Sequence, residues 1–316
     1  MKEFLHNIKQ IMRNCIDRVS SLQLCLTKSI QKRRFEKVSA QCLHNYKNLC
    51  KESISKYLTE AWEKKCQKME RIMLPTPDFS FLRDPEIQAT MTLSGGGEIL
   101  KAELSYCEKR IPPKVLRPLL KEDYVGHPVI RNYKYLTSHT RIHHLYHLLK
   151  FESKTKKRLE DLTDIIEWGG GYGDMALLLR RINSSITYTI IDIPLFSCIQ
   201  WIYLVSILPE EQINLIQAKD EKVKRKKINL LPLCFLEFFE PNSEMFIATW
   251  SLSESTNYAM DYASSRDFFK ATHFLLAYQD NNKSFPNASR IGKIAIDHGG
   301  SIEPNELFPG NYYSFK

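Results

Sequence analysis

The chain has 316 residues, of which 43% are hydrophobic and 26% charged, a composition typical of a globular protein with one large or two modest domains. It contains no apolar run of about 18 residues, and its first residues lack the apolar stretch of a signal peptide. The formal net charge of +9 lies wholly in residues 1–75, which carry 16 Lys and Arg against 7 Asp and Glu. These features argue against a membrane-spanning or secreted protein.

The chain contains eight cysteines, and none of them forms a C-x-x-C pair. Their spacings fit no zinc-binding pattern, so we expect no metal site built from cysteine. Cysteines scattered in this way are typical of buried small apolar side chains in a reducing compartment. They favour a cytoplasmic location.

Residues 1–72 contain neither proline nor glycine, and their apolar residues recur at helical spacings of three and four. One stripe covers residues 4–22 and a second covers residues 46–62. The pattern predicts two or three amphipathic helices that end before Pro75.

The densest basic cluster in this region is Lys32-Arg33-Arg34 with Lys37. It fits either a solvated helix face or a surface attracted to an anionic membrane or an acidic glycan. We therefore predict that residues 1–75 form a basic helical region for assembly or docking, either at the inner face of a membrane or against a second copy of the chain. We do not expect it to build the ligand site, because the net charge is confined to this region.

Residues 76–150 are predicted to form a helical cap or linker segment. Ser94–Glu98 is rich in glycine but lacks the G-K-[ST] ending of a phosphate-binding loop, so a plain loop is expected. A helix is predicted over residues 137–149, with Thr137 or Ser138 as its cap.

His143 and His147 are four residues apart on this helix, which is also a spacing of metal ligands. No glutamate lies between them as in H-E-x-x-H, so we predict no metal site. We expect instead that some of the histidines face a cleft.

From residue 151 onward, apolar runs alternate with helical patterns, which predicts a parallel sheet of the α/β class. The predicted strands are Asp164–Trp168, Thr187–Asp192, Ile228–Leu231, Met245–Trp250, His273–Tyr278, Lys293–His298 and Asn311–Phe315. The last two have no helix between them and should form a terminal hairpin. Residues 151–316 are therefore predicted to be one domain with a seven-stranded, Rossmann-like sheet.

A glycine-dense turn, Gly169-Gly170-Gly171-Tyr172-Gly173, follows the first predicted strand. Glycine suits a turn against which a ligand lies, because it adopts positive φ without steric cost. The spacing is G-x-G-x-G, and Asp174 occupies the third glycine position of the dinucleotide fingerprint G-x-G-x-x-G.

Two acidic residues flank this turn. Glu167 has no role in binding a pyrophosphate, but its carboxylate suits a ligand with a cationic amino-acid end. Asp192 ends the second predicted strand, where it can hydrogen-bond a ribose diol. Together with the turn, they resemble motifs one and two of the class I S-adenosylmethionine (SAM)-dependent methyltransferases, whose sheet also has seven strands and a terminal hairpin.

Other motifs make the resemblance more specific. They are residues 124–128, the helix with its His-His-Leu-Tyr-His run, Ile191–Pro194 followed by Gln200, and Trp250–Glu254. With the glycine turn they look like a bacterial family of sugar O-methyltransferases associated with surface polysaccharide and O-antigen gene sets. The resemblance covers roughly residues 120–316, and it implies SAM as cofactor and a sugar, nucleotide-sugar or lipid-linked glycan as acceptor.

The resemblance also implies roles for individual residues. Glu167, Gly169, Gly171 and Gly173 would hold the methionine part of SAM, and Asp192 its ribose. The expected cofactor-binding set is completed by Gly170, Tyr172, Trp250 and Ser251.

A sugar hydroxyl is a poor nucleophile, so a base should take its proton as it attacks the methyl group. Ligands of open α/β sheets bind beyond the carboxyl ends of the strands. The candidate bases there are Glu254, after the fourth predicted strand, and His298, after the sixth. His143 and His144 can reach the same cleft from the preceding helix.

Other functions stay open. The basic N-terminal region would suit a nucleic-acid methyltransferase. Enzymes that methylate exocyclic base nitrogens, however, carry Asp or Asn, then Pro-Pro and an aromatic residue, where this chain has Ser251-Leu252-Ser253-Glu254. The missing third glycine argues against a nicotinamide-dependent oxidoreductase. A different small-molecule acceptor, or a non-catalytic interaction protein with a SAM-binding fold, is also compatible with the sequence.

Overall fold

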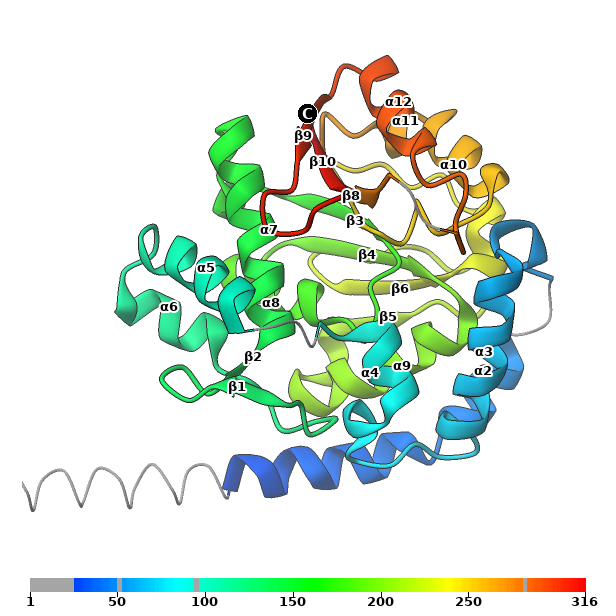
Figure 1. Cartoon of the computed structure of the whole chain (residues 1–316). Coiled ribbons are helices and arrows are strands. Elements are labelled where there is room, and N and C mark those ends of the chain that lie inside the picture. The colour runs from blue at the N-terminus through cyan, green and yellow to red at the C-terminus, as the bar shows by residue number, and fades with distance from the viewer. Residues whose placement is uncertain (1–25, 50–52, 94–96, 281–282) are drawn as a thin grey trace, which may run out of the picture.

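A computed structural model describes residues 26–49, 53–93, 97–280 and 283–316 (Figure 1). An eight-stranded sheet lies at the centre of this part of the chain. Side by side, its strands are β5 (Ile213–Leu215), β6 (Ile228–Pro232), β4 (Thr187–Asp192), β3 (Asp164–Trp168), β7 (Met245–Thr249), β8 (His273–Gln279), β10 (Asn311–Phe315) and β9 (Ser301–Pro304). The first six run parallel, and β10 runs antiparallel to both of its neighbours.

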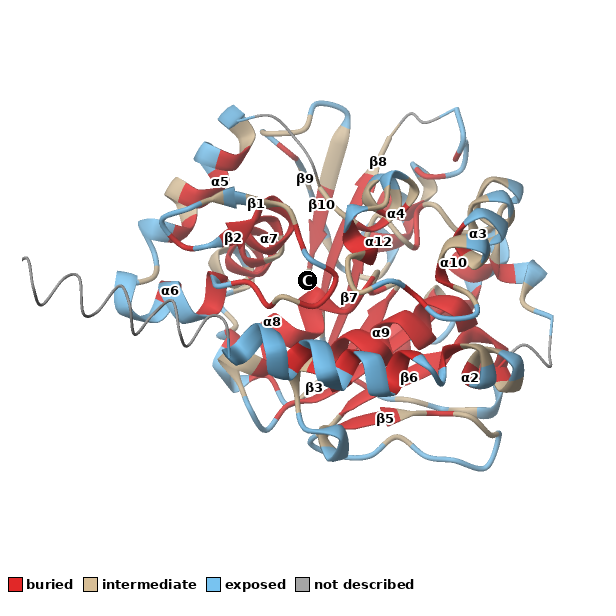
Figure 2. Ribbon diagram, turned by 90° about the horizontal axis from the view of Figure 1, so that it is seen from below, coloured by how far each residue is buried: buried red, intermediate tan, exposed pale blue. Residues whose placement is uncertain are grey.

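The parallel strands form the core because they are apolar along most of their length. All six residues of β4 and four of the five in β3 are buried, and the strands of the sheet are mostly buried in Figure 2. A parallel sheet needs cover on both faces. The covering helices are α7 (His139–Thr155), α8 (Asp174–Ile182), α9 (Pro194–Ile207), α10 (Asn257–Ser264), α11 (Asp267–Lys270) and α12 (Arg290–Asp297).

The predicted Rossmann-like sheet with a terminal hairpin is confirmed, and β5 adds a strand at its edge. Strands β3, β4 and β10 begin and end as predicted, and β6, β7 and β8 each differ from the prediction by one residue at their ends. The helix predicted over residues 137–149 is α7. Its cap is Ser138, whose Oγ accepts a hydrogen bond from the Arg141 amide at 3.1 Å.

The predicted strand at Lys293–His298 is wrong, because these residues lie in α12 and at its end. Ile291, Ile294 and Ala295 recur at helical spacing and are buried. A helix is needed here because a chain that leaves the carboxyl end of β8 must return to the amino end before the next parallel strand begins. The sixth strand of the predicted set is instead β9, which forms the hairpin with β10.

The N-terminal region is helical where the structure describes it. It contains a helix over residues 26–39, then α2 (Cys42–Leu49), α3 (Glu60–Met73), α4 (Pro85–Met91), α5 (Gly97–Glu108) and α6 (Pro113–Leu120), followed by the small hairpin of β1 (Ile130–Asn132) and β2 (Thr137–Ser138). The basic cluster at residues 32–37 lies on an exposed face of the first helix. Its contact with a membrane or a second copy stays a prediction. The stripe at residues 4–22 lies outside the described residues.

Two local predictions in this region need correction. Gly97 and Glu98 begin α5, whereas a loop was expected there; residues 94–96 of that loop lie outside the described residues. The stripe at residues 46–62 does not form one helix face, since α2 ends at Leu49 and residues 55–57 form a single 3-10 turn before α3.

Tertiary packing overrides the helical pattern at this turn. Tyr57 is buried, and its ring packs against Trp168, Tyr258 and Tyr262 with centroid distances of 6.2, 5.3 and 5.8 Å. Its carbonyl accepts a hydrogen bond from the Thr256 amide at 3.3 Å. The segment is thereby fixed to the loop that follows β7.

One apolar core extends from Phe35 to Phe315 and crosses both predicted boundaries, near residues 75 and 150. The three-part division of the chain stays a prediction. Among the described residues, no helix has both the length and the apolar character that a membrane crossing requires.

We predict that Tyr57→Ala lowers the free energy of unfolding by about 3–5 kcal/mol, the usual cost of deleting a buried aromatic side chain. The control is Tyr133→Ala, at a side chain that is 80% exposed, which should change stability by less than about 0.5 kcal/mol. Urea denaturation measures both. Equal effects of the two substitutions would show that the 55–57 turn is not packed onto the β7 side of the sheet.

Candidate functional site

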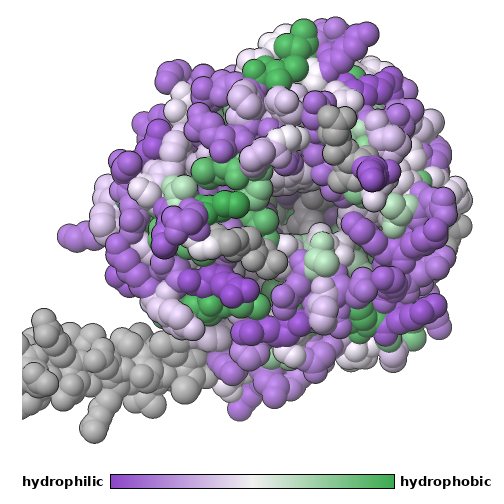
Figure 3. Space-filling view, in the orientation of Figure 1, coloured by the Kyte–Doolittle hydropathy of each residue, from purple (hydrophilic) through white to green (hydrophobic). Residues whose placement is uncertain are grey.

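A cavity of about 390 Å³ lies at the carboxyl ends of β3, β4 and β7, and the surface is hollowed there (Figure 3). The strand order reverses at this point, since β4 lies on one side of β3 and β7 on the other. Ligands of open α/β sheets bind at such switch points, and the volume is that of a small-molecule site. The walls come from Glu167–Tyr172, Ile191–Ile193, Thr249–Ser251, Glu254, three residues of α7 and, from the N-terminal part, Leu58, Trp62 and residues 89–93.

The glycine turn forms the floor of this cavity. Gly169 has a φ of +75°, and a Cβ on it would lie 2.3 Å from the Cβ of Ser251, so only glycine allows this close approach. Gly171 has a φ of +55°, and a Cβ on it would face open space, with Met91 Cβ at 3.9 Å as its nearest neighbour. The space above Gly171 is therefore free for a ligand.

Asp192, the last residue of β4, also lies at the floor of the cavity. Its Oδ2 accepts hydrogen bonds from the Gly170 amide at 2.9 Å and from Gln200 Nε2 at 2.7 Å, and its Oδ1 accepts one from the Ile193 amide at 2.8 Å. A carboxylate has about four acceptor positions, so Oδ1 retains one for a ligand hydroxyl. Burial raises the pKa of Asp192 to about 7, and a hydrogen-bond donor on a ligand would favour its charged form.

Glu167 lies beneath the turn and is 2% exposed. Its Oε2 accepts a hydrogen bond from the Tyr188 hydroxyl at 3.0 Å. Burial raises the pKa of Glu167 to about 7, although the nearby charge of His144 partly opposes this. No ion pair to Glu167 is formed by a Lys or Arg of the described ranges, so a cationic group on a ligand would supply a missing counter-charge.

Beside the turn, Arg141 of α7 is fully buried among carboxylates. Its Nε donates to Asp174 Oδ1 at 3.0 Å, and its guanidinium lies 3.2 Å from Glu122 and 3.4 Å from Asp123. The other oxygen of Asp174 lies 2.9 Å from His144 Nδ1. Burial alone would raise the pKa of Asp174, but Arg141 and His144 hold it well below its usual range. His144 is thus oriented by an ionised carboxylate at the edge of the cavity.

His143 lines the cavity beside Trp250, the residue that follows β7. Its ring stacks on Trp250 with centroids 5.4 Å apart, and its Nδ1 lies 2.6 Å from Oε1 of the buried Glu103. Burial lowers the pKa of His143, and its Nε2 is enclosed by protein without a hydrogen-bond partner. Trp250 is held in the left-handed region with a φ of 63°, and its Nε1 donates to Asn311 Oδ1 at 2.7 Å.

His143 and His147 share a face of α7, with ring centroids 4.0 Å apart. His147 Nδ1 lies 2.7 Å from the Tyr313 hydroxyl, which fixes its ring inside the core. In the ranges that the structure describes, no group of three or more His, Cys, Asp or Glu side chains is placed to hold a metal ion.

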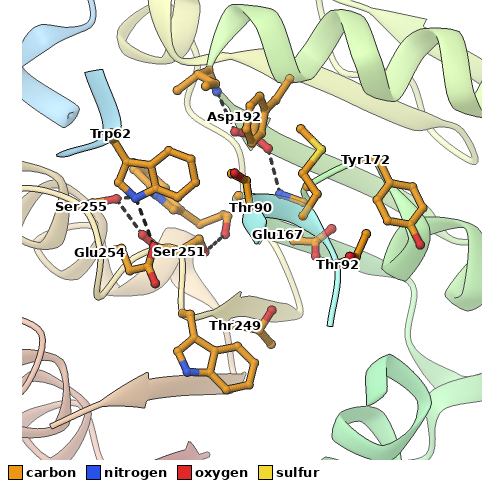
Figure 4. A pocket seen from close by; sticks show the side chains of 18 of the residues that line it. Trp62, Thr90, Thr92, Glu167, Tyr172, Asp192, Thr249, Ser251, Glu254 and Ser255 are labelled. Atoms are coloured by element: carbon orange, nitrogen blue, oxygen red, sulfur yellow. Dashed lines mark hydrogen bonds between the residues drawn. The ribbon is translucent and has the colours of Figure 1, made fainter. Parts of the chain in front are cut away.

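The N-terminal region builds part of the cavity, and the prediction that it would not is wrong. Leu58 and Trp62 line the wall, and Trp62 Nε1 donates to Glu254 Oε2 at 3.1 Å (Figure 4). The other oxygen of Glu254 accepts a hydrogen bond from Gln279 Nε2 at 3.3 Å, and burial raises the pKa of Glu254. Net charge could not reveal this wall because the side chains that form it carry no charge.

His298, the second candidate base, does not reach the cavity. Its ring nitrogens lie 2.8 Å from the Ile294 carbonyl and 3.0 Å from the Ser264 carbonyl. Gly300, two residues further on, packs against Phe274 at the start of β8. His298 therefore lies at the amino ends of the strands, because the helix mistaken for a strand carries it to the opposite edge of the sheet.

The structure brings the other predicted residues together, with one exception. The cavity is lined by Glu167, Gly169, Gly170, Gly171, Tyr172, Asp192, Trp250, Ser251, Glu254, His143 and His144. Gly173 lies behind the floor as the N-cap of α8, with a φ of 96°, and shapes the turn. Tyr172 also packs edge-on against Tyr203 at 4.9 Å.

Three contributors were given no role from the sequence, although Gln200 belonged to one of the motifs. Gln200 holds both Asp192 and the Gly171 carbonyl, and Arg141 holds Asp174. Gln200 lies in the mostly apolar α9, where a long polar side chain is a usable signal for a residue that serves a site, whereas Arg141 lies among other polar residues of α7 and has no such signal. The third contributor is the wall at residues 89–93, and it has no such signal in the sequence.

Comparison with known proteins gives no family model and no curated protein that matches the chain. Similar solved structures include precorrin-6y C5,15-methyltransferase from Geobacter metallireducens, with 13% identity, a TM-score of 0.37 and coverage of 63% of this chain and 96% of that one. An O-methyltransferase family protein from Burkholderia thailandensis has 9% identity, a TM-score of 0.38 and coverage of 95% and 97%. Magnesium protoporphyrin IX methyltransferase from Synechocystis, solved with bound SAH, has 12% identity, a TM-score of 0.36 and coverage of 68% and 98%. Similarity at this level does not assign a function to the chain.

We predict that Glu167→Gln flattens the pH dependence of stability between pH 4.5 and 7. The unfolded carboxyl ionises near its ordinary pKa of 4.5 and the folded one near 7, so the wild type loses stability as the pH rises through this window. The loss is at most about 1.4 kcal/mol per pH unit, and the variant should not show it.

Urea denaturation at pH 5, 6 and 7 measures this effect. The exposed Glu210→Gln serves as the control and should follow the wild type. The same pH dependence of the free energy of unfolding in all three proteins would contradict a raised pKa at Glu167.

Proposed function

We propose that the chain is a SAM-dependent methyltransferase. One observation carries the proposal. The glycine turn after β3, Glu167 beneath it and Asp192 at the end of β4 line a single cavity at the switch point of the sheet. An adenosyl amino acid presents the complementary groups, which are a ribose diol for one carboxylate and an ammonium group for the other.

The residues present fit this cofactor. Open space lies above Gly171, and Asp192 Oδ1 retains an acceptor position. The apolar side chains of Ile193, Phe196 and Leu233 line the cavity on the Asp192 side, where they would contact the adenine ring. When bound, SAM supplies a methyl group on a positively charged sulfur.

We infer that the acceptor is a hydroxyl of a sugar or of a sugar-containing glycan precursor. Trp62 and Trp250 line the cavity, and indole faces suit sugar rings. Between them, Glu254 offers a carboxylate that can accept hydrogen bonds from a diol. Because burial moves its pKa towards neutrality, Glu254 is also the residue that we expect to take the proton of the hydroxyl.

A nucleic-acid acceptor is the alternative, together with other small molecules and a non-catalytic role. No Lys or Arg occurs among the described residues that line the cavity, which disfavours a polyanionic acceptor. Methyl transfer to glycan but not to RNA or DNA would support the sugar proposal, and transfer to neither would favour binding without catalysis.

We predict that calorimetry detects SAM or its demethylated product at this site. Asp192→Ala and Gly171→Val should each weaken binding by about tenfold or more, because the first removes the ribose acceptor and the second fills the space above the turn. The exposed Asp220→Ala is the matched acidic control. Tighter binding of NAD than of SAM, or unchanged affinity in the folded variants, would contradict the proposal.

We predict that Glu254→Gln keeps SAM affinity but lowers kcat by about 10²-fold, the usual scale for loss of a general base. Labelled SAM and a surface-glycan extract provide the assay. The control is Glu237→Gln, because Glu237 contacts Lys56 of the same N-terminal segment but does not line the cavity. A raised KM with unchanged kcat would mean that Glu254 only positions the acceptor.

A further inference from the structure

Helix α7 contributes two adjacent histidines to the cavity wall, and they have different partners. His143 stacks on Trp250, at the end of β7 where the acceptor should bind. His144 pairs with Asp174, the first residue of α8 directly after the glycine turn. Neighbouring residues on a helix point about 100° apart, so the two imidazoles serve different parts of a ligand.

Asp174 fixes the ring of His144 in the wall of the cavity. Its Nδ1 lies 2.9 Å from Asp174 Oδ2, while Asp174 Oδ1 is occupied by Arg141. Asp174 has no exposed surface, and the His144 side chain is 19% exposed. A buried carboxylate at Nδ1 fixes the orientation of the ring, so Nε2 is the nitrogen left for a ligand in the cavity.

Glu167 is an acidic side chain of the same cavity. Glu167 precedes the glycine turn, and the partner of His144, Asp174, directly follows it. An imidazole and a carboxylate in one cavity can contact the carboxylate and the ammonium group of a zwitterion. The methionine end of SAM is a zwitterion of this kind, with an ammonium group and a carboxylate on one carbon.

Resting on the proposed function, we propose that His144, held by Asp174 and Arg141, binds the carboxylate of the cofactor's amino-acid end while Glu167 binds its ammonium group. His144 is then a binding residue and not the base that the sequence predicted. Its position supports this role, because its partner Asp174 follows the glycine turn, whereas the acceptor should meet the methyl group beside β7.

Three adenosyl ligands test the proposal by calorimetry. S-adenosylhomocysteine carries the whole amino-acid end, its decarboxylated analogue lacks only the carboxylate, and 5′-methylthioadenosine lacks both charged groups. His144→Ala should lower the affinity for S-adenosylhomocysteine by about 10- to 100-fold, the scale of a lost charged hydrogen bond. The same substitution should change the affinity for the other two ligands by less than about twofold.

Two further variants sharpen the test. His144→Gln keeps a neutral hydrogen-bond donor, so its affinity for S-adenosylhomocysteine should lie between those of the wild type and His144→Ala. It replaces the alanine variant if that variant does not fold. The exposed His44→Ala should bind all three ligands as the wild type does. Thermal denaturation checks that each variant is folded.

The outcomes separate this inference from the proposed function. If the wild type binds none of the three ligands, the proposed function fails, and the inference fails with it. If the wild type binds S-adenosylhomocysteine but His144→Ala weakens all three ligands equally, or none of them, the proposed function stands and the carboxylate role of His144 is wrong. A fall in kcat with unchanged affinity for S-adenosylhomocysteine would instead make His144 the base.

Discussion

The site depends on one buried charge cluster centred on Arg141. The guanidinium has no exposed surface and contacts Asp174 at the start of α8, Glu122 and Asp123 before the β1–β2 hairpin, and the Tyr203 hydroxyl of α9. Isolated buried charges are too costly to persist, so these segments must stay together for the charges to be compensated. Because Asp174 directly follows the glycine turn, the same cluster fixes the floor of the cavity against α7. Gln31 of the N-terminal helix extends the cluster through a 3.0 Å hydrogen bond to Asp123.

The floor of the cavity has the opposite character. Glu167 and Asp192 form no ion pair with any Lys or Arg that the structure describes, and burial raises the pKa of both to about 7. Arg141 thus compensates the charges of Glu122, Asp123 and Asp174. For Glu167 and Asp192, a ligand would have to supply the compensating groups. Such an imbalance is common where a protein is shaped for a ligand, because the groups that hold the ligand are incompletely paired in its absence.

The sequence allowed the sheet and the floor of the site to be predicted, because both rest on local patterns. Apolar runs mark the buried parallel strands, and glycine spacing with Glu167 and Asp192 marks the turn at the switch point. What could not be predicted depends on contacts between distant segments. Trp62 reaches Glu254 across 192 positions, and Tyr57 leaves its helical pattern to pack against Trp168. The error at residues 293–298 had a different origin, since a short apolar stretch fits a strand or a helix equally well and only its connection decides between them.

The two edges of the sheet have a consequence for how the protein behaves in solution. The edge strands β5 and β9 have three and four residues, and β9 ends at Pro304. The loop after β5 carries the charge run at residues 219–227, most of it exposed. Unpaired strand edges are templates for pairing with other chains, and short edges, proline and lysine all oppose such pairing. Any self-association of the protein should therefore use its helical surfaces, and growth of the sheet from one molecule into the next is disfavoured.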